Sequence, residues 1–198
     1  MYKVFLDDKK ILVTNTLKKS YKRKYRIFTL DNISVEDFIR KIDGYKSGKF
    51  LFYIESQDPL KEFLKPFTLI SAGGGVVRNP KGRILFIKRK GKWDLPKGKL
   101  ETGEDIKECA RREVEEETRV KDLRVLGKRV ITYHIYKQDQ RWLLKETHWY
   151  NMYSDSKEDL HPQKEEDIEV CAWKKPKKLK KLLKNSFSSL QEVFRGEY

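Results

Sequence analysis

Hydrophobic and polar positions alternate along the first third of the chain in a pattern typical of short strands and two helices. SVEDFIRKI places Ser34 three residues before the acidic Asp37, which is the signature of a helix start. A second short helix is expected in DPLKEFLKPF, ending near Pro66. Runs rich in β-branched and aromatic residues predict four strands: YKVFL, ILVT, YRIFTL and LFYIE. Residues 1–67 therefore predict a small α+β unit, with a boundary in the loop at residues 66–70.

After this boundary the pattern changes to longer strands and one strongly charged helix. The charged helix is expected in DIKECARREVEEET, after a long Gly- and Pro-marked loop, WDLPKGKLETGE. Helical segments are also expected at about residues 176–184 and 187–195. The predicted strands are AGGGVV and RILFIKRK around the turn NPKG, then LRVLGKRVITYHIYK, RWLLKETHWYNMYS and IEVCAW. This mixture predicts a second domain, residues 68–198, with a mixed sheet and helices on its faces.

Composition narrows the classes of protein that fit the chain. Its 198 residues suffice for one well-cored domain and a small accessory unit. Apolar runs are too short for a membrane span, and MYKVFLDDKK lacks the apolar core of a signal peptide, so we expect a cytoplasmic protein with no membrane partner. The cysteines, Cys109 and Cys171, are too few for a metal-thiolate site and imply no disulfide framework. The net charge of +15 favours polyanionic partners such as nucleotides, inositol phosphates or nucleic acid.

Against this basic background, RREVEEETRV concentrates negative charge on one helix. Helical spacing places Glu113, Glu116 and Glu117 on one face and Glu115 on the other. Like charges at this spacing repel, and Mg²⁺ or Mn²⁺, which prefer oxygen ligands, would remove the repulsion. The alternative is that the glutamates only pair with neighbouring arginines.

The surrounding segment, GKLETGEDIKECARREVEEETRV, resembles the Nudix box, G-x5-E-x7-R-E-U-x-E-E-x-G-U with U aliphatic. The flanking AGGGVV, WDLPKGKLE and IEVCAW are also similar to their counterparts in the family. Arg119 departs from the box by replacing its glycine after the helix, where a left-handed residue is usual. A side chain there costs on the order of 1 kcal/mol and threatens helix termination rather than chemistry. The matching positions are Gly98, Glu104, Arg112, Glu113, Val114, Glu116, Glu117 and Val120.

The resemblance covers about residues 68–198 and implies both a fold and an activity. The implied fold class is α/β (α+β), a Nudix-type α/β/α sandwich with a mixed β-sheet, here with a small N-terminal α+β accessory region. The implied activity is hydrolysis of a nucleoside diphosphate linked to another group, by metal-activated water.

The resemblance also implies roles for individual residues. Glu116 and Glu117 would be the principal ligands of Mg²⁺ or Mn²⁺, with Glu113 as a ligand or water-orienting base. Arg112 would hold the carboxylate of Glu113 in place. Glu104 and the main-chain carbonyl of Lys97 would complete the metal site.

Residues outside the helix are candidates for a base and for substrate contacts. Some family members place the general base on a late loop, where this chain has Glu165 and Glu166; both could equally be solvent-exposed acids. Arg89, Lys97 and Lys99 flank the loop before the helix and are candidate phosphate binders, although exposed loop lysines are common. The three histidines show no ligand spacing.

Substrate markers favour a (di)nucleoside polyphosphate. Tyr136 lies sixteen residues after Val120, where diadenosine polyphosphate hydrolases of the family carry a tyrosine, and the WDLPKG loop is similar to theirs. An RNA 5′-end pyrophosphohydrolase is an alternative, with KKSYKRKYR as part of an RNA track. A non-catalytic nucleotide-sensing regulator is a third reading, although residues 1–67 offer no DNA-binding helical domain. The sequence leaves a homodimer open.

Overall fold

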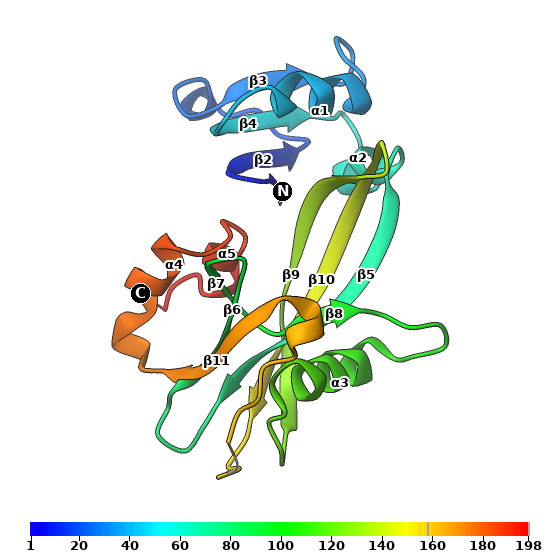
Figure 1. The fold of residues 1–198 in the computed structure, drawn as a ribbon. Helices are drawn as coiled ribbons and strands as arrows, with labels where there is room; N and C mark the ends of the chain where they lie inside the picture. Colours follow the sequence, from blue (N-terminus) through cyan, green and yellow to red (C-terminus); the bar gives the residue numbers. More distant parts are fainter. Residues whose placement is uncertain (158, 198) are drawn as a thin grey trace. The chain divides into compact units, whose positions relative to one another are not determined.

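The computed structural model describes residues 1–157 and 159–197 and divides them into two compact units (Figure 1). Unit 1 comprises Met1–Leu69 and Tyr133–Lys145, and unit 2 comprises Ile70–Thr132 and Glu146–Tyr198. Each unit has its own hydrophobic core. Among the described residues, no helix is both long and apolar enough to cross a membrane.

Unit 1 is a mixed sheet packed against helices. In α1 (Val35–Asp43) the Ser34 side chain accepts a hydrogen bond from the Asp37 amide at 3.1 Å, so this helix begins where the sequence predicts. Its buried face packs against phenylalanines of the sheet, including Phe50 and Phe52. The sheet order is β1-β2-β4-β3, with β1 and β2 antiparallel and the other pairs parallel. The remaining elements are β1 (Tyr2–Leu6), β2 (Lys9–Thr14), η1 (Lys19–Tyr21), β3 (Arg26–Thr29), β4 (Gly48–Tyr53) and α2 (Pro59–Leu64).

The tip of a long hairpin completes unit 1. The hairpin consists of β9 (Arg124–Gln138) and β10 (Arg141–Tyr153), and its tip, residues 133–145, belongs to unit 1. Strand β1 pairs in parallel with β9, from Val4↔Tyr133 to Leu6↔Ile135. Ile135 and Leu144 are fully buried in the core of unit 1. The expected boundary at residues 67/68 thus lies close to residues 69/70, where the chain first passes from unit 1 to unit 2. Unit 1 also includes residues 133–145, which lie far along the chain.

Unit 2 has helices on both faces of its sheet, which confirms the predicted α/β/α arrangement. Successive residues of β5 point to opposite faces: Val76 joins a core with α4 and α5, and Val77 joins a core with α3. The strand order is β11-β6-β5-β10-β9. Its elements besides the hairpin are β5 (Thr68–Arg78), β6 (Ile84–Arg89), β7 (Lys92–Asp94), β8 (Lys97–Lys99), α3 (Ile106–Thr118), η2 (Lys164–Glu166), β11 (Ile168–Lys174), η3 (Pro176–Lys178), α4 (Leu179–Lys184) and α5 (Leu190–Val193).

Two expectations about local structure need correction. The segment 93–104, predicted to be a long loop, contains β8 and the end of β7, which add short antiparallel ladders to β5 and β6. The predicted helical segment at residues 187–195 is α-helical only over Leu190–Val193. In both cases pairing or packing with the rest of unit 2 decides the local structure, and the sequence pattern does not report it.

Candidate active site

Helix α3 is held against the sheet so that its charged face meets the segment before it. Asp105 caps the start of the helix, and its side chain accepts a hydrogen bond from the Lys107 amide at 2.8 Å. A Cβ at Gly73 of β5 would lie 2.6 Å from the Ala110 nitrogen, so only glycine permits this close approach. Arg119 ends the helix in the left-handed conformation, φ 57°, and its amide donates to the Glu115 carbonyl at 2.7 Å.

Arg112 lies at the centre of the acidic cluster. Its guanidinium donates to both oxygens of Glu104, at 2.7 and 2.9 Å, and to one oxygen each of Glu113 and Glu116, at 2.9 and 3.0 Å. It also donates to the Lys99 carbonyl at 3.1 Å. The hydrogen bonds from Arg112 lower the pKa of Glu104 to about 2, and its carboxylate partners raise the pKa of Arg112.

Glu117 lies on the same side of α3 but deeper in the protein. Its side chain is 2% exposed and accepts a hydrogen bond from the Lys97 amide at 2.9 Å. Burial raises its pKa to about 7, although the positive charge of Lys97 opposes the shift. Burial also raises the pKa of Glu113, against the opposing effect of Arg112, and the charges of Glu116 and Glu166 add to the increase. In both carboxylates burial thus disfavours the charged form, and a divalent cation would favour it.

Gly98 explains why strand β8 can run so close to these carboxylates. A Cβ at this position would collide with the carboxylate of Glu113. The absence of a side chain at Gly98 therefore leaves room for that carboxylate beside the Lys97 and Lys99 main chain. Oxygen donors and buried negative charge both fit a hard divalent cation.

The cluster is not arranged as a finished metal site. Among residues 1–157 and 159–197, no three His, Cys, Asp or Glu side chains stand in a group that could hold a metal ion. Arg112 bonds only one oxygen of Glu113 and one of Glu116, which leaves the second oxygen of each carboxylate outside these bonds. A cation at these residues would therefore need modest side-chain movement.

The other predicted residues differ in how closely the structure links them to the acidic cluster. The Arg89 guanidinium pairs with Glu166 of η2 at 3.2 Å, and Glu166 influences Glu113 electrostatically. Glu165 lies in the same exposed turn. Lys99 is exposed, and its carbonyl anchors Arg112. Tyr136 belongs to unit 1, so its contact with substrate stays a prediction.

Asp94 is a buried acid next to this site that the sequence pattern did not single out. Its side chain is bonded to the ammonium of Lys97 at 2.6 Å, so that ammonium, a predicted phosphate binder, already has a carboxylate partner. In the sequence, the one indication of this ion pair is that Asp94 precedes Lys97 by three residues within the predicted loop.

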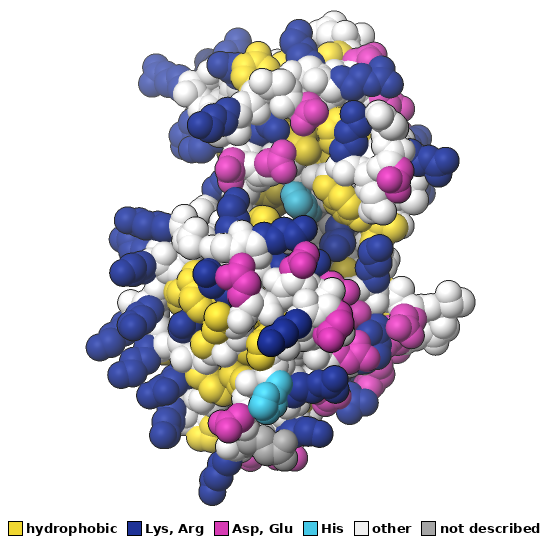
Figure 2. Space-filling model, viewed as in Figure 1, with side chains coloured by type: hydrophobic (Ala, Val, Ile, Leu, Met, Phe, Trp, Pro, Cys, Tyr) yellow, Lys and Arg dark blue, Asp and Glu magenta, His cyan; other side chains and the backbone are white. Residues whose placement is uncertain are grey.

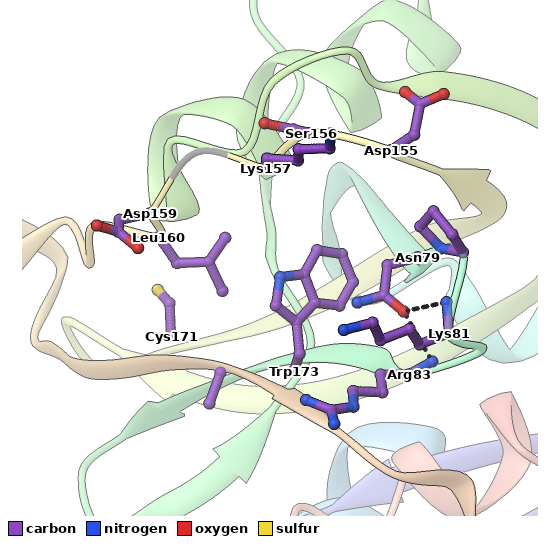
Figure 3. A pocket seen from close by; sticks show the side chains of 12 residues that line it. Asn79, Lys81, Arg83, Asp155, Ser156, Lys157, Asp159, Leu160, Cys171 and Trp173 are labelled. Carbon is purple, nitrogen blue, oxygen red and sulfur yellow. Dashed lines mark hydrogen bonds between the residues drawn. The ribbon is translucent and has the colours of Figure 1, made fainter.

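Figure 2 shows acidic side chains gathered over α3 and the segment before it, whereas Lys and Arg are dense over α4. A pocket of about 970 Å³ lies between the β5–β6 turn, residues 155–157 and 159–160, and β11 (Figure 3). Neither Arg112 nor the glutamates bonded to it line this pocket. We therefore do not assign the pocket to the acidic cluster.

Comparison with known proteins decides the family. The family profile for the NUDIX domain matches residues 69–194, well over half of the chain. The chain belongs to the Nudix family. It is accordingly a Nudix pyrophosphohydrolase, and the resemblance drawn from the box is confirmed.

Solved structures agree with the Nudix fold of unit 2. A MutT protein from Methanosarcina mazei Go1 is similar with a TM-score of 0.51 and 21% identity, over 66% of this chain and 94% of that chain. A binary complex of a C. elegans Ap4A hydrolase is similar with a TM-score of 0.51 and 18% identity, over 64% of this chain and 93% of that chain. At these identities the likeness shows the fold. Nudix hydrolases generally use divalent metal ions, which matches the donor set around α3.

Proposed function

We propose that this Nudix hydrolase cleaves a pyrophosphate bond of a nucleoside polyphosphate, with a dinucleoside polyphosphate as the first candidate, and depends on Mg²⁺ or Mn²⁺. The observation that carries the proposal is the convergence of Glu104, Glu113 and Glu116 on Arg112, with Glu117 of α3 hydrogen-bonded to the Lys97 amide of β8. Support for the substrate class comes from the WDLPKG loop, from the net charge of +15, and from a structural neighbour that is an Ap4A hydrolase.

In this proposal Glu116 and Glu117 are the principal metal ligands, joined by Glu113, Glu104 and the Lys97 carbonyl. The bound cation would neutralise phosphate oxygens and lower the pKa of a water molecule. Arg112 fixes the orientation of three carboxylates at once, because its donors are planar and rigid.

The general base is assigned to Glu166, with Glu113 and Glu165 as alternatives. Glu166 is the late-loop acid that influences Glu113 electrostatically, and it is paired with Arg89. Arg89 is a phosphate binder in this proposal, so substrate phosphate would compete with Glu166 for its guanidinium. Release of Glu166 from Arg89 would leave its carboxylate available to accept a proton from water.

The metal assignment is tested by Glu117→Gln and Glu116→Gln. Each should lower kcat by about a hundredfold or more, because replacing even outer-shell partners of a metal commonly costs 10–100-fold. The matched control is Glu115→Gln on the opposite side of α3, where Glu115 lies 3.9 Å from Arg111. Turnover is measured as the release of phosphorylated products in the presence of Mg²⁺ or Mn²⁺. Unchanged turnover in both active-site variants would remove the metal assignment.

The substrate is tested with a panel of mononucleoside and dinucleoside polyphosphates, inositol phosphates and 5′-triphosphorylated RNA, with identification of the products. Preferential cleavage of dinucleoside polyphosphates is expected. Cleavage of RNA ends with a steep salt dependence would instead support the RNA alternative. Binding of nucleotide without cleavage would support a sensor. A cytoplasmic location and a homodimer stay predictions.

A further inference from the structure

Asp94 and Lys97 form a buried ion pair at the edge of the proposed metal site. Asp94 is 2% exposed, and one of its oxygens accepts a hydrogen bond from the Leu95 amide at 2.8 Å. The other oxygen accepts from the Lys97 ammonium at 2.6 Å. Neither Asp94 nor the Lys97 side chain belongs to the box, and the proposed chemistry uses neither charge.

Lys97 stands between two buried carboxylates. Its main-chain amide donates to Glu117 at 2.9 Å, while its ammonium is bonded to Asp94. Burial disfavours the charged ammonium, whereas the negative charges of Asp94 and Glu117 both favour it, and the net effect raises the pKa of Lys97. A lysine ammonium on a flexible four-carbon stem can exchange one carboxylate for another close by.

The Lys97 main chain is held in place by β5, so only its side chain can move between Asp94 and Glu117. The Gly75 amide donates to the Pro96 carbonyl at 3.1 Å, and β8 pairs with β5 at Gly74↔Lys97. A Cβ at Gly74 would lie 2.6 Å from the Lys97 Cβ, which shows how tightly the two strands meet. Without Asp94, the ammonium would have Glu117 as its buried acceptor, and it would then compete there with a cation.

We propose that Asp94 is a positioning residue that holds the Lys97 ammonium away from Glu117 and so leaves the Glu117 carboxylate available for a divalent cation. This inference rests on the proposed metal role of Glu117. A purely structural view gives Asp94 only the task of satisfying a buried lysine. The two views differ in what happens when the lysine charge is removed together with Asp94.

The test is Mn²⁺ binding to the full-length protein, measured by titration calorimetry without substrate. Asp94→Asn should weaken Mn²⁺ binding about tenfold, since a neighbouring opposite charge commonly changes carboxylate energetics by about one pKa unit or more. The double variant Asp94→Asn with Lys97→Met should bind Mn²⁺ at least as tightly as the wild type, because no ammonium remains to occupy Glu117. The Lys97 carbonyl is retained in this variant.

The outcomes separate this inference from the proposed function. The role of Asp94 is overturned if Asp94→Asn binds Mn²⁺ as tightly as the wild type does, or if the double variant binds Mn²⁺ as weakly as the single variant does. Neither result overturns the proposed metal site. Failure of the wild type to bind Mn²⁺ overturns the metal site and this role with it. Asp94→Ser, which can still accept from the Leu95 amide, replaces Asp94→Asn if the latter does not fold. If neither single variant folds while the double variant does, Asp94 serves folding only and the inference is overturned.

Discussion

At the scale of single residues, Arg119 shows how a departure from the box is accommodated. It adopts φ 57°, the left-handed conformation in which the family's glycine would be unstrained, and its amide still caps α3 through Glu115. The substitution therefore preserves the helix end and leaves Glu113, Glu116 and Glu117 in place. The substitution instead lowers the free energy of unfolding.

Arg119→Gly is accordingly expected to stabilise the protein. Relief of left-handed strain should outweigh the greater flexibility of glycine in the unfolded chain, for a net gain of about 0.5–1 kcal/mol in the free energy of unfolding. Arg119→Ala is the control, because alanine keeps a Cβ and should bring no gain. Urea denaturation measures both variants, and equal stability of the two would show that backbone strain is not the cause.

At the scale of elements, the sequence predicts α3 and the long strands well and the segment before the helix poorly. Helix α3 follows from its capping residue and periodicity, which are local properties. Strands β7 and β8 are three residues each, and their pairing with β6 and β5 depends on partners distant in sequence. For the same reason the box positions could be read from spacing, while the partnership of Asp94 with Lys97 could not.

The contact between β8 and α3 makes Gly98 sensitive to the smallest substitution. Gly98→Ala should lower activity strongly while the protein remains folded, because the new methyl group would displace the Glu113 carboxylate. Gly127→Ala is the matched control, since a Cβ there meets nothing within 4 Å. Turnover and circular dichroism are measured for both variants. Wild-type activity in Gly98→Ala would show that the position of Glu113 is not critical.

At the scale of the whole molecule, the hairpin of β9 and β10 contributes to the cores of both units. Leu144 is fully buried in unit 1, and Tyr150 and Met152 of the same strand are buried in unit 2. The pattern of the first 67 residues could not reveal this, because the tip lies more than sixty residues beyond the predicted boundary. Long-range packing, rather than local propensity, therefore defines unit 1.

Leu144→Ala should destabilise unit 1 by about 2–5 kcal/mol, as expected for a large-to-small change in a core. Hydrogen exchange should accelerate in residues 1–69, with a smaller effect in α3. Leu126→Ala is the control, because Leu126 is 67% exposed. Equal protection of unit 1 in both variants would contradict a core role for the hairpin tip.

The shared hairpin also means that three chain passages join the two units, at residues 69/70, 132/133 and 145/146. A protease that cuts once near residue 69 would sever only one of them. The resulting N-terminal fragment would still pair through β1 with β9 and bury Ile135 and Leu144. We expect such a nicked protein to migrate as one species under native conditions and to separate only in denaturant, as a complementing pair of fragments.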